Sequence, residues 1–292
     1  MKILCIGVSM SEIKLIKSPM NYVGGKYKLL PQIIPLFPKE IDTFIDLFCG
    51  GFNVGINVKA NRIIGNDVCN EVIEVYKGIQ KEGLENSLKL IKNEINKYEL
   101  SKTNEKGYKS IRDKYNSGDN DWYVFYSMLV HSFNYQIRFN KKGEYNMPFG
   151  RNKSYFNPTL EKNFIEFAKS IESKNIVFTN NSFEDLKIDK LNNKDFVYLD
   201  PPYLITCASY NESDGWNIDK EKRLLGICDN LNRNGIKFAL SNVLEHKGLK
   251  NDVLIDWCKK YNVNYLNHNY NNCNYQKNDK NNKTIEVLIT NY

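Results

Sequence analysis

The sequence predicts an α/β fold in which helices cover both faces of a doubly wound, mostly parallel sheet. Short apolar runs that end at a carboxylate occur at residues 43–48, 62–67 and 195–200, and a similar run at 236–242 ends in Ser-Asn. Continuous apolar runs of this length are typical of strands that are buried on both faces, as in parallel sheets. Helical periodicity separates several of these runs, so strands and helices alternate along the chain.

The expected helices are identified by the spacing of their apolar residues. They lie at residues 70–79, 160–172, 219–233 and 249–261. The pattern changes near residue 263, because two strand-like runs, at 263–270 and 283–292, follow each other with no helix between them. An antiparallel hairpin is therefore expected to close the sheet.

Residues 80–157 interrupt the alternation and are expected to form a mainly helical insertion between residues 1–79 and 158–292. They include the stretch "HSFNYQIRFNKKGEYNMPFGRNKSY" at 131–155, in which aromatic residues and asparagines lie among the charges. Its basic residues are opposed by Glu144 alone, and they are Arg138, Lys141, Lys142, Arg151 and Lys153. Such a mixture can contact phosphates and base edges together, although a solvated surface hairpin is the simpler alternative.

The composition is that of a soluble globular protein, with 292 residues, 41% hydrophobic residues and a formal net charge of +7. A mild basic excess fits a polyanionic partner such as nucleic acid, but charge alone does not establish one. No apolar stretch suits a secretion signal or a membrane span. The seven cysteines form no CxxC pair and only three histidines are present. We therefore expect no metal site, and reduced thiols in a cytoplasmic protein.

A glycine-rich turn follows the first predicted strand, in "DLFCGGFNVG" at 46–55. Gly50 and Gly51 allow a tight turn and a close ligand approach, and Asp67 ends the next strand, where an acid can accept both hydroxyl protons of a ribose. The GxGxxG spacing of dinucleotide folds is absent, so S-adenosylmethionine fits better than a dinucleotide. A second glycine pair, in "NYVGGKYKLL" at 21–30, lacks the spacing of a phosphate loop and is also compatible with a simple helix start.

The tetrapeptide Asp-Pro-Pro-Tyr follows the predicted strand at 195–200. Asp200 is expected at the carboxyl end of a central strand, where α/β sheets bind ligands. Pro201 and Pro202 make the turn rigid and leave carbonyls free to accept hydrogen bonds, while Tyr203 offers a flat face for a base. This arrangement suits an exocyclic or amide nitrogen that attacks a sulfonium methyl, and the alternative is a chance sequence in a loop.

These motifs together resemble the adenine-specific DNA methyltransferases of the Dam and DpnII type, the D12 class. The match runs from about residue 18 to 292, in the order of the family. It consists of "NYVGGK", "DLFCGGFNVG", "NDVCNEVI", "IRFNKKGEYNMPFGR" and "DPPY". The resemblance implies a Rossmann-like S-adenosylmethionine domain at 1–79 and 158–292, with a DNA target-recognition domain inserted at 80–157. It also implies N6-methylation of a flipped adenine in double-stranded DNA, within restriction-modification or by an orphan or phage-type enzyme.

The resemblance assigns roles to individual residues. It implies that Asp200, Pro201, Pro202 and Tyr203 hold the target adenine. It implies cofactor contacts by Tyr22, Lys26, Asp46, Cys49, Gly50, Gly51, Asp67, Asp200 and, in the segment "NNSFEDL", Ser182 and Phe183. It implies DNA contacts by Asn21, Asn134, Gln136, Arg138, Asn140, Lys142, Pro148 and Arg151.

Three positions depart from the family pattern. Ser182 stands where relatives usually place an acid, so the contact to the cofactor's adenine is expected to be weaker or supplied by a neighbour. GATC-reading relatives have a lysine where this chain has Asn21, and Asn-Gly-Leu-x-Arg where it has "NYQIR" at 134–138. GATC is therefore not assumed as the target, and "TCASYNESDGW" at 206–216 is more similar to relatives with asymmetric targets.

Two kinds of alternative stay open at the level of sequence. A similar fold could methylate RNA, cytosine N4 or a protein amide, although the 131–155 stretch disfavours this. A relative without catalysis could only bind DNA, although Asp200 and Tyr203 are present. A cognate restriction endonuclease is a further expected partner, while no membrane partner and no metal are expected.

Overall fold

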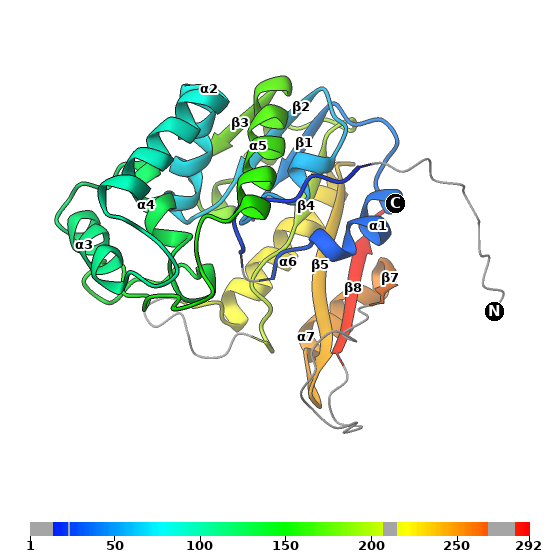
Figure 1. The fold of residues 1–292 in the computed structure, drawn as a ribbon. Helices are drawn as coiled ribbons and strands as arrows, with labels where there is room; N and C mark the ends of the chain where they lie inside the picture. Colours follow the sequence, from blue (N-terminus) through cyan, green and yellow to red (C-terminus); the bar gives the residue numbers. More distant parts are fainter. Residues whose placement is uncertain (1–13, 23, 207–214, 268–283) are drawn as a thin grey trace.

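The structure is a computed structural model that describes residues 14–22, 24–206, 215–267 and 284–292 (Figure 1). Its strands are β1 (Thr43–Asp46), β2 (Arg62–Asn66), β3 (Ile176–Thr179), β4 (Phe196–Leu199), β5 (Lys237–His246), β6 (Leu249–Lys250), β7 (Asn262–Leu266) and β8 (Thr284–Thr290). Its α-helices are α1 (Leu30–Ile33), α2 (Asn70–Lys97), α3 (Glu105–Asn116), α4 (Trp122–Leu129), α5 (Pro158–Ser173), α6 (Ile218–Arg233) and α7 (Asp252–Trp257).

These strands form one sheet in the order β3-β2-β1-β4-β5-β8-β7, with β6 paired to β5. The strands from β3 to β5 are parallel, whereas β8 pairs antiparallel with both β5 and β7. The expected antiparallel hairpin is confirmed for the described parts of its two strands. The chain winds outward from β1 toward β3 and then from β4 toward β5, so the order reverses between β1 and β4. Ligands of open α/β sheets bind at the carboxyl ends of the strands beside such a reversal.

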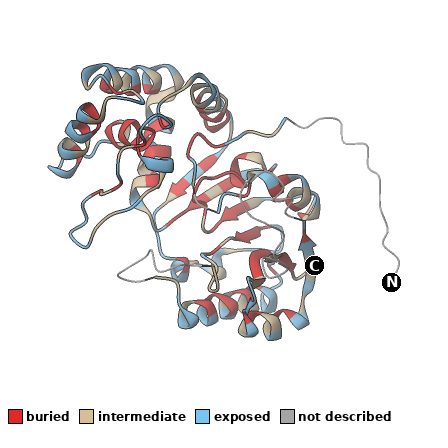
Figure 2. Ribbon diagram, turned by 60° about the horizontal axis from the view of Figure 1, so that its bottom comes forward, coloured by how far each residue is buried: buried red, intermediate tan, exposed pale blue. Residues whose placement is uncertain are grey.

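Two hydrophobic clusters cover the two faces of the sheet, because successive residues of a strand point to opposite sides. On β1, Phe44 belongs to the cluster shared with α1, α2 and α5, and Ile45 to the cluster shared with α6 and α7. Figure 2 shows the buried residues concentrated in the strands and on the inner sides of the helices. The doubly wound α/β fold predicted from the sequence is therefore confirmed.

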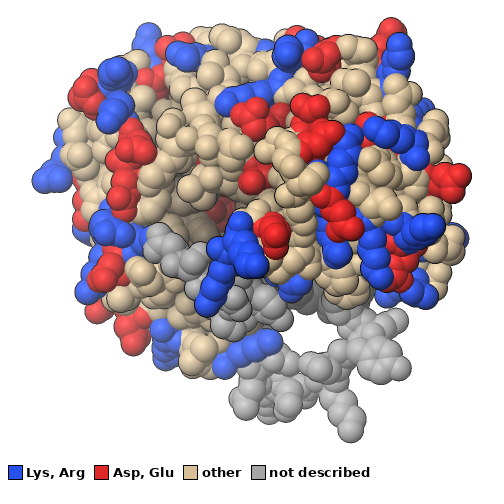
Figure 3. Space-filling view, turned by 90° about the vertical axis from the view of Figure 1, so that its left-hand side faces the viewer, with Lys and Arg blue, Asp and Glu red and all other residues tan. Residues whose placement is uncertain are grey.

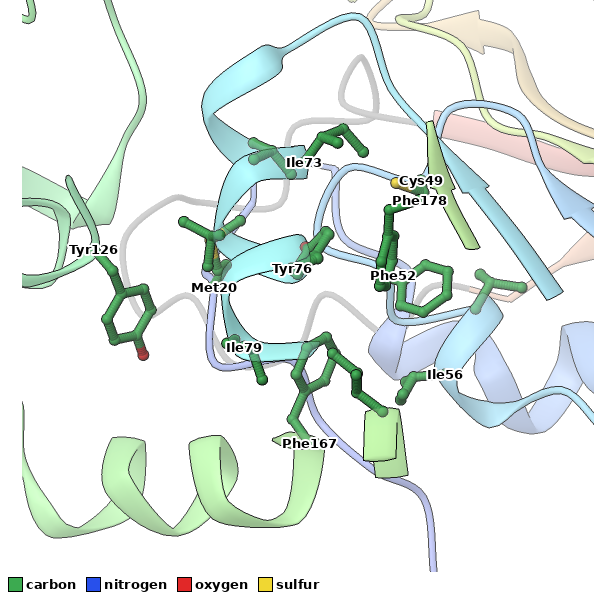
Figure 4. Packing of buried hydrophobic residues seen from close by; sticks show 14 of the residues in the cluster. Met20, Cys49, Phe52, Ile56, Ile73, Tyr76, Ile79, Tyr126, Phe167 and Phe178 are labelled. Carbon is green, nitrogen blue, oxygen red and sulfur yellow. The ribbon is translucent and has the colours of Figure 1, made fainter. Parts of the chain in front are cut away.

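Phe52 fixes the shape of the turn that follows β1. Its backbone has a positive φ of 55°, and its ring is fully buried against Tyr76, Phe167 and Phe178 (Figure 4). A Cβ atom at Gly55 would overlap the Phe52 ring, so glycine is required there. Burial of a large aromatic ring stabilises the fold enough to offset a strained backbone of about 1–3 kcal/mol. The packing of the Phe52 ring in the core therefore fixes the conformation of this turn.

Two of the expected helices have different bounds in the structure. The helix expected at 70–79 continues to Lys97, with an interruption at Gly83 (φ 74°, ψ 172°). The backbone N–H of Leu84 donates to Glu172 Oε1 at 2.6 Å and starts the second half of α2. The helix expected at 249–261 begins only at Asp252, because residues 249–250 pair with Glu245 and His246 of β5.

The region between residues 80 and 157 contains the second half of α2 together with α3 and α4 (Figure 1). Buried residues of α3 and α4, such as Tyr108 and Phe125, belong to the same hydrophobic cluster as α2, α5 and one face of the sheet. The proposed boundary at residues 79 and 80 falls inside α2, four residues before Gly83. The assignment of 80–157 as a separate domain stays a prediction.

Several expectations concern residues that lie outside the described part of the chain. These are Cys5, Cys207 and Cys273, most of the 206–216 stretch, and the loop ends of the C-terminal hairpin. Within the described residues, Cys49, Cys69, Cys228 and Cys258 are free thiols. No helix in the described ranges is long and apolar enough to span a membrane.

Candidate active site

The predicted site residues converge at the reversal of strand order. Asp46 is the last residue of β1, and Asp200 directly follows β4, its parallel neighbour. Because both strands end at the same edge of the sheet, both carboxyl groups lie at that edge. The rigid Pro201–Pro202 turn follows, with Pro201 buried and Pro202 exposed.

The segment that precedes α1 is fastened to the glycine-rich turn by two asparagines. The Ile16 N–H donates to Asn57 Oδ1 at 2.8 Å, and Asn57 Nδ2 donates back to Ile16 O at 2.7 Å. The Ser18 N–H donates to Asn53 Oδ1 at 3.0 Å. These contacts between residues far apart in the sequence bring the "NYVGGK" motif to the site.

Lys26, Asp200, Tyr203 and Glu286 form an interlocked group, here called the Asp200 cluster. Lys26 Nζ lies 2.9 Å from Asp200 Oδ2 and 3.8 Å from Glu286 Oε1, and its side chain is only 5% exposed. The Tyr203 hydroxyl lies 3.1 Å from Asp200 Oδ1 and 3.0 Å from Glu286 Oε1. The ammonium also lies 5.0 Å from the centre of the Tyr203 ring, a cation–π distance.

The glycine-rich turn lies against Tyr22 and Asp67. Gly50 has a positive φ of 43°, and a Cβ atom on it would lie 2.8 Å from Cδ1 of Tyr22. Asp67 Oδ2 accepts the Gly50 N–H at 2.8 Å, and Asp67 Oδ1 accepts the Cys69 N–H at 2.9 Å. A carboxylate offers about four acceptor positions, so further hydrogen bonds to Asp67 are chemically available. Asp67 thus ties the turn after β1 to the end of β2.

Two buried carboxyl groups, of Asp46 and Asp67, share this edge of the sheet with Asp200, whose side chain is 17% exposed. Burial, together with the nearby Asp200 and Asp67, raises the pKa of Asp46 to about 8, although the Gly55 N–H bond acts to lower it. Burial also raises the pKa of Asp67 and of Asp200, although Lys26 acts to lower the pKa of Asp200. Lys26 is the buried cation that contacts this group. The surplus of acid over base favours a ligand that carries positive charge.

Phe183 and Ser182 lie beyond the end of β3. The Phe183 ring is buried and packs 5.5 Å from Phe48 and 5.4 Å from Trp216, measured between ring centroids. Ser182 is exposed, and its hydroxyl accepts the Glu184 N–H at 3.3 Å as an N-terminal cap. Phe183 therefore lines an aromatic wall beside the glycine-rich turn, while the Ser182 side chain is used locally.

The basic segment at 131–155 is fastened at its base and exposed at its tip. Near its base, the Phe133 N–H donates to Pro148 O at 2.8 Å. Arg138 Nε donates to Asn146 Oδ1 at 2.7 Å, so this exposed guanidinium is held in one orientation. Asn140 Oδ1 accepts the Lys142 N–H at 2.9 Å, which closes the turn that presents the lysine.

Arg151 and Asn21 connect this segment to other parts of the molecule. Arg151 forms an ion pair with Glu105 at the start of α3. Asn21 Nδ2 donates to Asn134 O at 3.4 Å, a long bond that joins the "NYVGGK" motif to the segment. Gln136 is half-buried, whereas Pro148 is exposed. Figure 3 shows this side of the molecule, where basic side chains are interspersed with acidic ones rather than gathered in one patch.

Three residues with plausible roles were not predicted from the sequence. Glu286 joins the Asp200 cluster from β8, and its signal is an acid between apolar residues in a buried strand. Phe133 is 46% exposed within the basic segment, and an exposed aromatic there suits contact with a base. Trp216 packs against Phe48 and donates from Nε1 to Glu221 Oε2 at 2.6 Å. Glu286 was not predicted because its partner Tyr203 is distant in sequence.

No group of three or more His, Cys, Asp or Glu residues within the described ranges is arranged to hold a metal ion. The chemistry of the site, as described, rests on carboxylates, a lysine and a tyrosine.

Known proteins match the chain over most of its length. The type II methyltransferase M.FokI of Planomicrobium okeanokoites is 50% identical over 281 residues, covering 95% of this chain and 43% of the relative. The modification methylase StsI of Streptococcus sanguinis is 48% identical over 290 residues, covering 97% of this chain and 44% of the relative. A DNA adenine methylase of Salmonella typhi is 27% identical over 233 residues, covering 76% of this chain and 79% of the relative.

The chain thus spans less than half the length of the first two relatives. The family described as D12 class N6 adenine-specific DNA methyltransferase matches residues 22–281. This range contains the motifs at the strand ends and three members of the Asp200 cluster, which are Lys26, Asp200 and Tyr203. Because this match covers most of the chain, the chain belongs to the D12 class N6 adenine-specific DNA methyltransferase family.

Proposed function

We propose that this protein transfers a methyl group from S-adenosylmethionine to N6 of an adenine that has rotated out of double-stranded DNA. The observation that carries the proposal is the partly buried carboxylate of Asp200 at the reversal of strand order, in a chain of this family. It lies beside Tyr203, Lys26 and the glycine turn that Asp67 holds.

Asp200 supplies the acceptor that the amine needs. The lone pair of adenine N6 is delocalised into the ring, so the nitrogen is a weak nucleophile. A hydrogen bond from N6 to Asp200, and a second to a carbonyl of the proline turn, favour the pyramidal nitrogen that attacks a methyl group. Burial raises the pKa of Asp200, whereas Lys26 and the Tyr203 hydroxyl bond act to lower it, so positive charge that develops on N6 would stabilise the carboxylate further.

The residues around the glycine turn fit a cationic nucleoside cofactor. Asp46 and Asp67 are buried and Asp200 is partly buried beside them, and these acids favour a ligand with positive charge, which S-adenosylmethionine carries as a sulfonium and an ammonium. When bound, the sulfonium supplies an electrophilic methyl group. Asp67 would accept hydrogen bonds from the ribose, and Tyr22 and Lys26 would hold the methionine end. Phe183 and Phe48 would pack against the adenine.

Target adenines in a duplex are paired and stacked, so Asp200 at the end of a buried strand cannot reach N6 without rotation of the nucleotide. Unstacking costs a few kcal/mol, and stacking on Tyr203 would return about 1–3 kcal/mol. The exposed Arg138, Lys142 and Arg151 would contact the DNA backbone and flanking bases meanwhile. Phe133, which is exposed in the same segment, would contact a base beside the place in the stack that the rotated adenine has left.

The test is to incubate the protein with S-adenosylmethionine and unmethylated genomic DNA, then to digest the DNA and measure methylated nucleosides by mass spectrometry. We expect N6-methyladenine, at a restricted set of sites in methylation-sensitive sequencing, and none with Asp200→Ala. N4-methylcytosine as the only product would contradict the assignment of the base. Methylation of RNA in preference to DNA would contradict the assignment of the polymer. A cognate restriction endonuclease is proposed as a functional partner, since the first relatives are named as a type II methyltransferase and a modification methylase.

A further inference from the structure

We propose that Glu286 is a positioning residue that takes the Tyr203 hydroxyl and the Lys26 ammonium away from Asp200 when the target amine binds. This inference rests on the proposed function. It adds a role for a carboxylate on β8, a strand that lies outside all the motifs discussed above.

The strand geometry places the Glu286 side chain at the site. Along β8, Val287 and Ile289 belong to the cluster under α6 and α7, while Leu288 belongs to the cluster under α1 and α2. Because side chains alternate, Glu286 points to the same face as Leu288. That face carries Lys26, and the Glu286 side chain is 7% exposed. A charged group buried in an apolar strand needs polar partners, and it finds them in the Asp200 cluster.

An irregularity in the neighbouring strand occurs at the same level. Val243 of β5 pairs with Glu286, and Glu245 pairs with Ile285, so Leu244 is an extra residue that bulges from the ladder. The Leu244 carbonyl accepts the Asn251 N–H at 3.0 Å instead. Bulges re-aim side chains and are frequent beside active sites. The bulge therefore marks the point at which the sheet adjusts around Glu286.

Each oxygen of Asp200 has one of these partners in this structure. Oδ2 lies 2.9 Å from the Lys26 ammonium, and Oδ1 lies 3.1 Å from the Tyr203 hydroxyl. A second lone pair on each oxygen can accept the target amine, but both partners draw negative charge away from Asp200 and weaken it as an acceptor, so the bond to the amine strengthens when they shift away. Removal of either partner without a new acceptor would leave a buried donor unpaired, which is costly.

Glu286 offers that new acceptor to both partners. Its Oε1 atom lies 3.0 Å from the Tyr203 hydroxyl, which has a single proton and can donate fully to only one carboxylate at a time. The same atom lies 3.8 Å from Lys26 Nζ, so a shift of roughly 1 Å brings the ammonium to hydrogen-bond distance. The Gly24 carbonyl, 2.8 Å from Nζ, keeps the lysine in place during the exchange.

The negative charge of Glu286 is essential to this role. A glutamine at the same position could still accept the Tyr203 hydroxyl bond, but it would not attract the ammonium. Lys26 would then stay with Asp200, and the target amine would have to compete with a full positive charge. The cost should appear in the step after DNA binding rather than in DNA affinity.

The first experiment compares single-turnover methylation by the wild-type protein and by Glu286→Gln at saturating S-adenosylmethionine and DNA. We expect the rate to fall about tenfold to a hundredfold, the effect of one hydrogen bond to a charged group, with dissociation constants for DNA and cofactor changed less than about threefold. Glu245→Gln, on the facing strand but outside the Asp200 cluster, is the matched control and should keep the wild-type rate. Thermal unfolding of each variant verifies that it is folded.

The second experiment combines Glu286→Gln with Lys26→Met, which removes the ammonium, in a double-mutant cycle. If Glu286 acts through the Lys26 ammonium, Glu286→Gln should slow methylation less in the Lys26→Met background than in the wild type. A purely structural role for Glu286 would give the same loss in both backgrounds. The cycle therefore distinguishes positioning from general stabilisation.

The outcomes for the two proposals are separable. A wild-type protein that methylates no DNA would overturn the proposed function, together with the role that rests on it. A wild-type protein that methylates adenine, with Glu286→Gln within about twofold of its rate or fully additive with Lys26→Met, would overturn the role of Glu286 alone.

Discussion

The carboxyl edge of the sheet and the basic segment at 131–155 hold their polar side chains in contrasting ways. At the edge, Lys26 is buried, Asp200 is mostly shielded from water, and the two form an ion pair, so their geometry is set before any ligand binds. In the segment, Arg138 and Lys142 reach into solvent, and only Arg138 is also held by Asn146. A methyl transfer needs a fixed geometry, whereas reading DNA tolerates side chains that adjust. Substitutions in the two regions should therefore differ in size and in kind.

The largest effect is expected at Asp200. Asp200→Ala removes the main acceptor for the amine and should lower the methylation rate by at least about 10²–10³-fold, comparable to the loss of a transition-state hydrogen bond. DNA binding should change little, because DNA affinity comes mainly from the exposed cations. Single-turnover kinetics and a DNA-binding titration measure the two quantities. Near-normal turnover would show that Asp200 does not act in the mechanism. Substitutions at the sheet edge and in the basic segment would then not differ as we expect in the size of their effects.

Tyr203 should show the next largest effect. Tyr203→Ala removes a stacking face worth about 1–3 kcal/mol and should slow methylation by about ten- to a hundredfold, with a smaller loss of DNA affinity. Tyr203→Phe keeps the ring and should retain part of the activity. With 2-aminopurine at the target position, fluorescence should rise on binding, blunted where the base stacks on Tyr203. Normal methylation by Tyr203→Ala, with no tighter binding to a mismatched target, would argue against its role in base flipping.

Asp67 separates cofactor binding from DNA binding. Asp67→Ala should weaken S-adenosylmethionine binding by about tenfold or more, since two hydroxyls lose a charged acceptor and the Gly50 N–H loses its partner. DNA affinity should be almost unchanged. Isothermal calorimetry with the cofactor and a fluorescence titration with DNA provide the comparison. Equal cofactor affinity in the variant and the wild type would place the ribose elsewhere.

The buried Asp46 predicts a dependence of cofactor binding on pH. Burial raises its pKa to about 8 in the free protein, so it is mostly protonated at neutral pH. A cationic cofactor beside it favours the charged form and lowers the pKa, so binding releases a proton. Affinity should therefore rise with pH up to about 8, by at most about tenfold per pH unit, and then level off.

Calorimetry in two buffers of different ionisation enthalpy measures this proton release. The cofactor's own amine also titrates, so Asp46→Asn is the control that isolates the contribution of Asp46. The variant should release fewer protons and show a flatter pH profile. Identical proton release by the two proteins would show that Asp46 keeps its protonation state on binding.

The smallest effects are expected in the basic segment. Lys142→Ala should weaken DNA binding a fewfold for all sequences and reduce the slope of log affinity against log salt by about one. Arg138→Ala, which removes a guanidinium oriented by Asn146, should instead relax the choice of target sequence. Binding titrations at several salt concentrations, with target and non-target duplexes, compare the two. A sequence-independent loss for Arg138→Ala would assign it to phosphate contact.

The sequence was sufficient to predict the strand ends that carry the site, and it was less informative about contacts between distant elements. Asp46, Asp67 and Asp200 were identified because each ends or follows an apolar run, and parallel strands bring such ends together. The strand at 249–250 was missed because two residues form a strand only through pairing with β5. Helix α2 extends beyond its predicted end because tertiary packing and Glu172 support the chain after Gly83.

The Asp200 cluster shows the same limit at the level of side chains. Lys26 and Asp200 form an ion pair although they lie far apart in the sequence, and no local sequence pattern predicts such a contact. The basic segment was predicted from its charges, but the hydrogen bond from Arg138 to Asn146, which orients the guanidinium, was visible only in three dimensions. The sequence therefore predicted which polar groups belong to the site, and the structure showed which of them form hydrogen bonds or ion pairs with each other.

The position of β8 has a consequence for biosynthesis. A ribosome delivers β5 and β7 before β8, yet β8 lies between them in the finished sheet. Until β8 emerges, the edge of β5 has no partner, and an open edge invites pairing with other chains. Glu286 emerges with β8, after Lys26, Asp200 and Tyr203 have been made. The sheet between β5 and β7 and the Asp200 cluster are thus completed together, and we expect neither to form before β8 has left the ribosome.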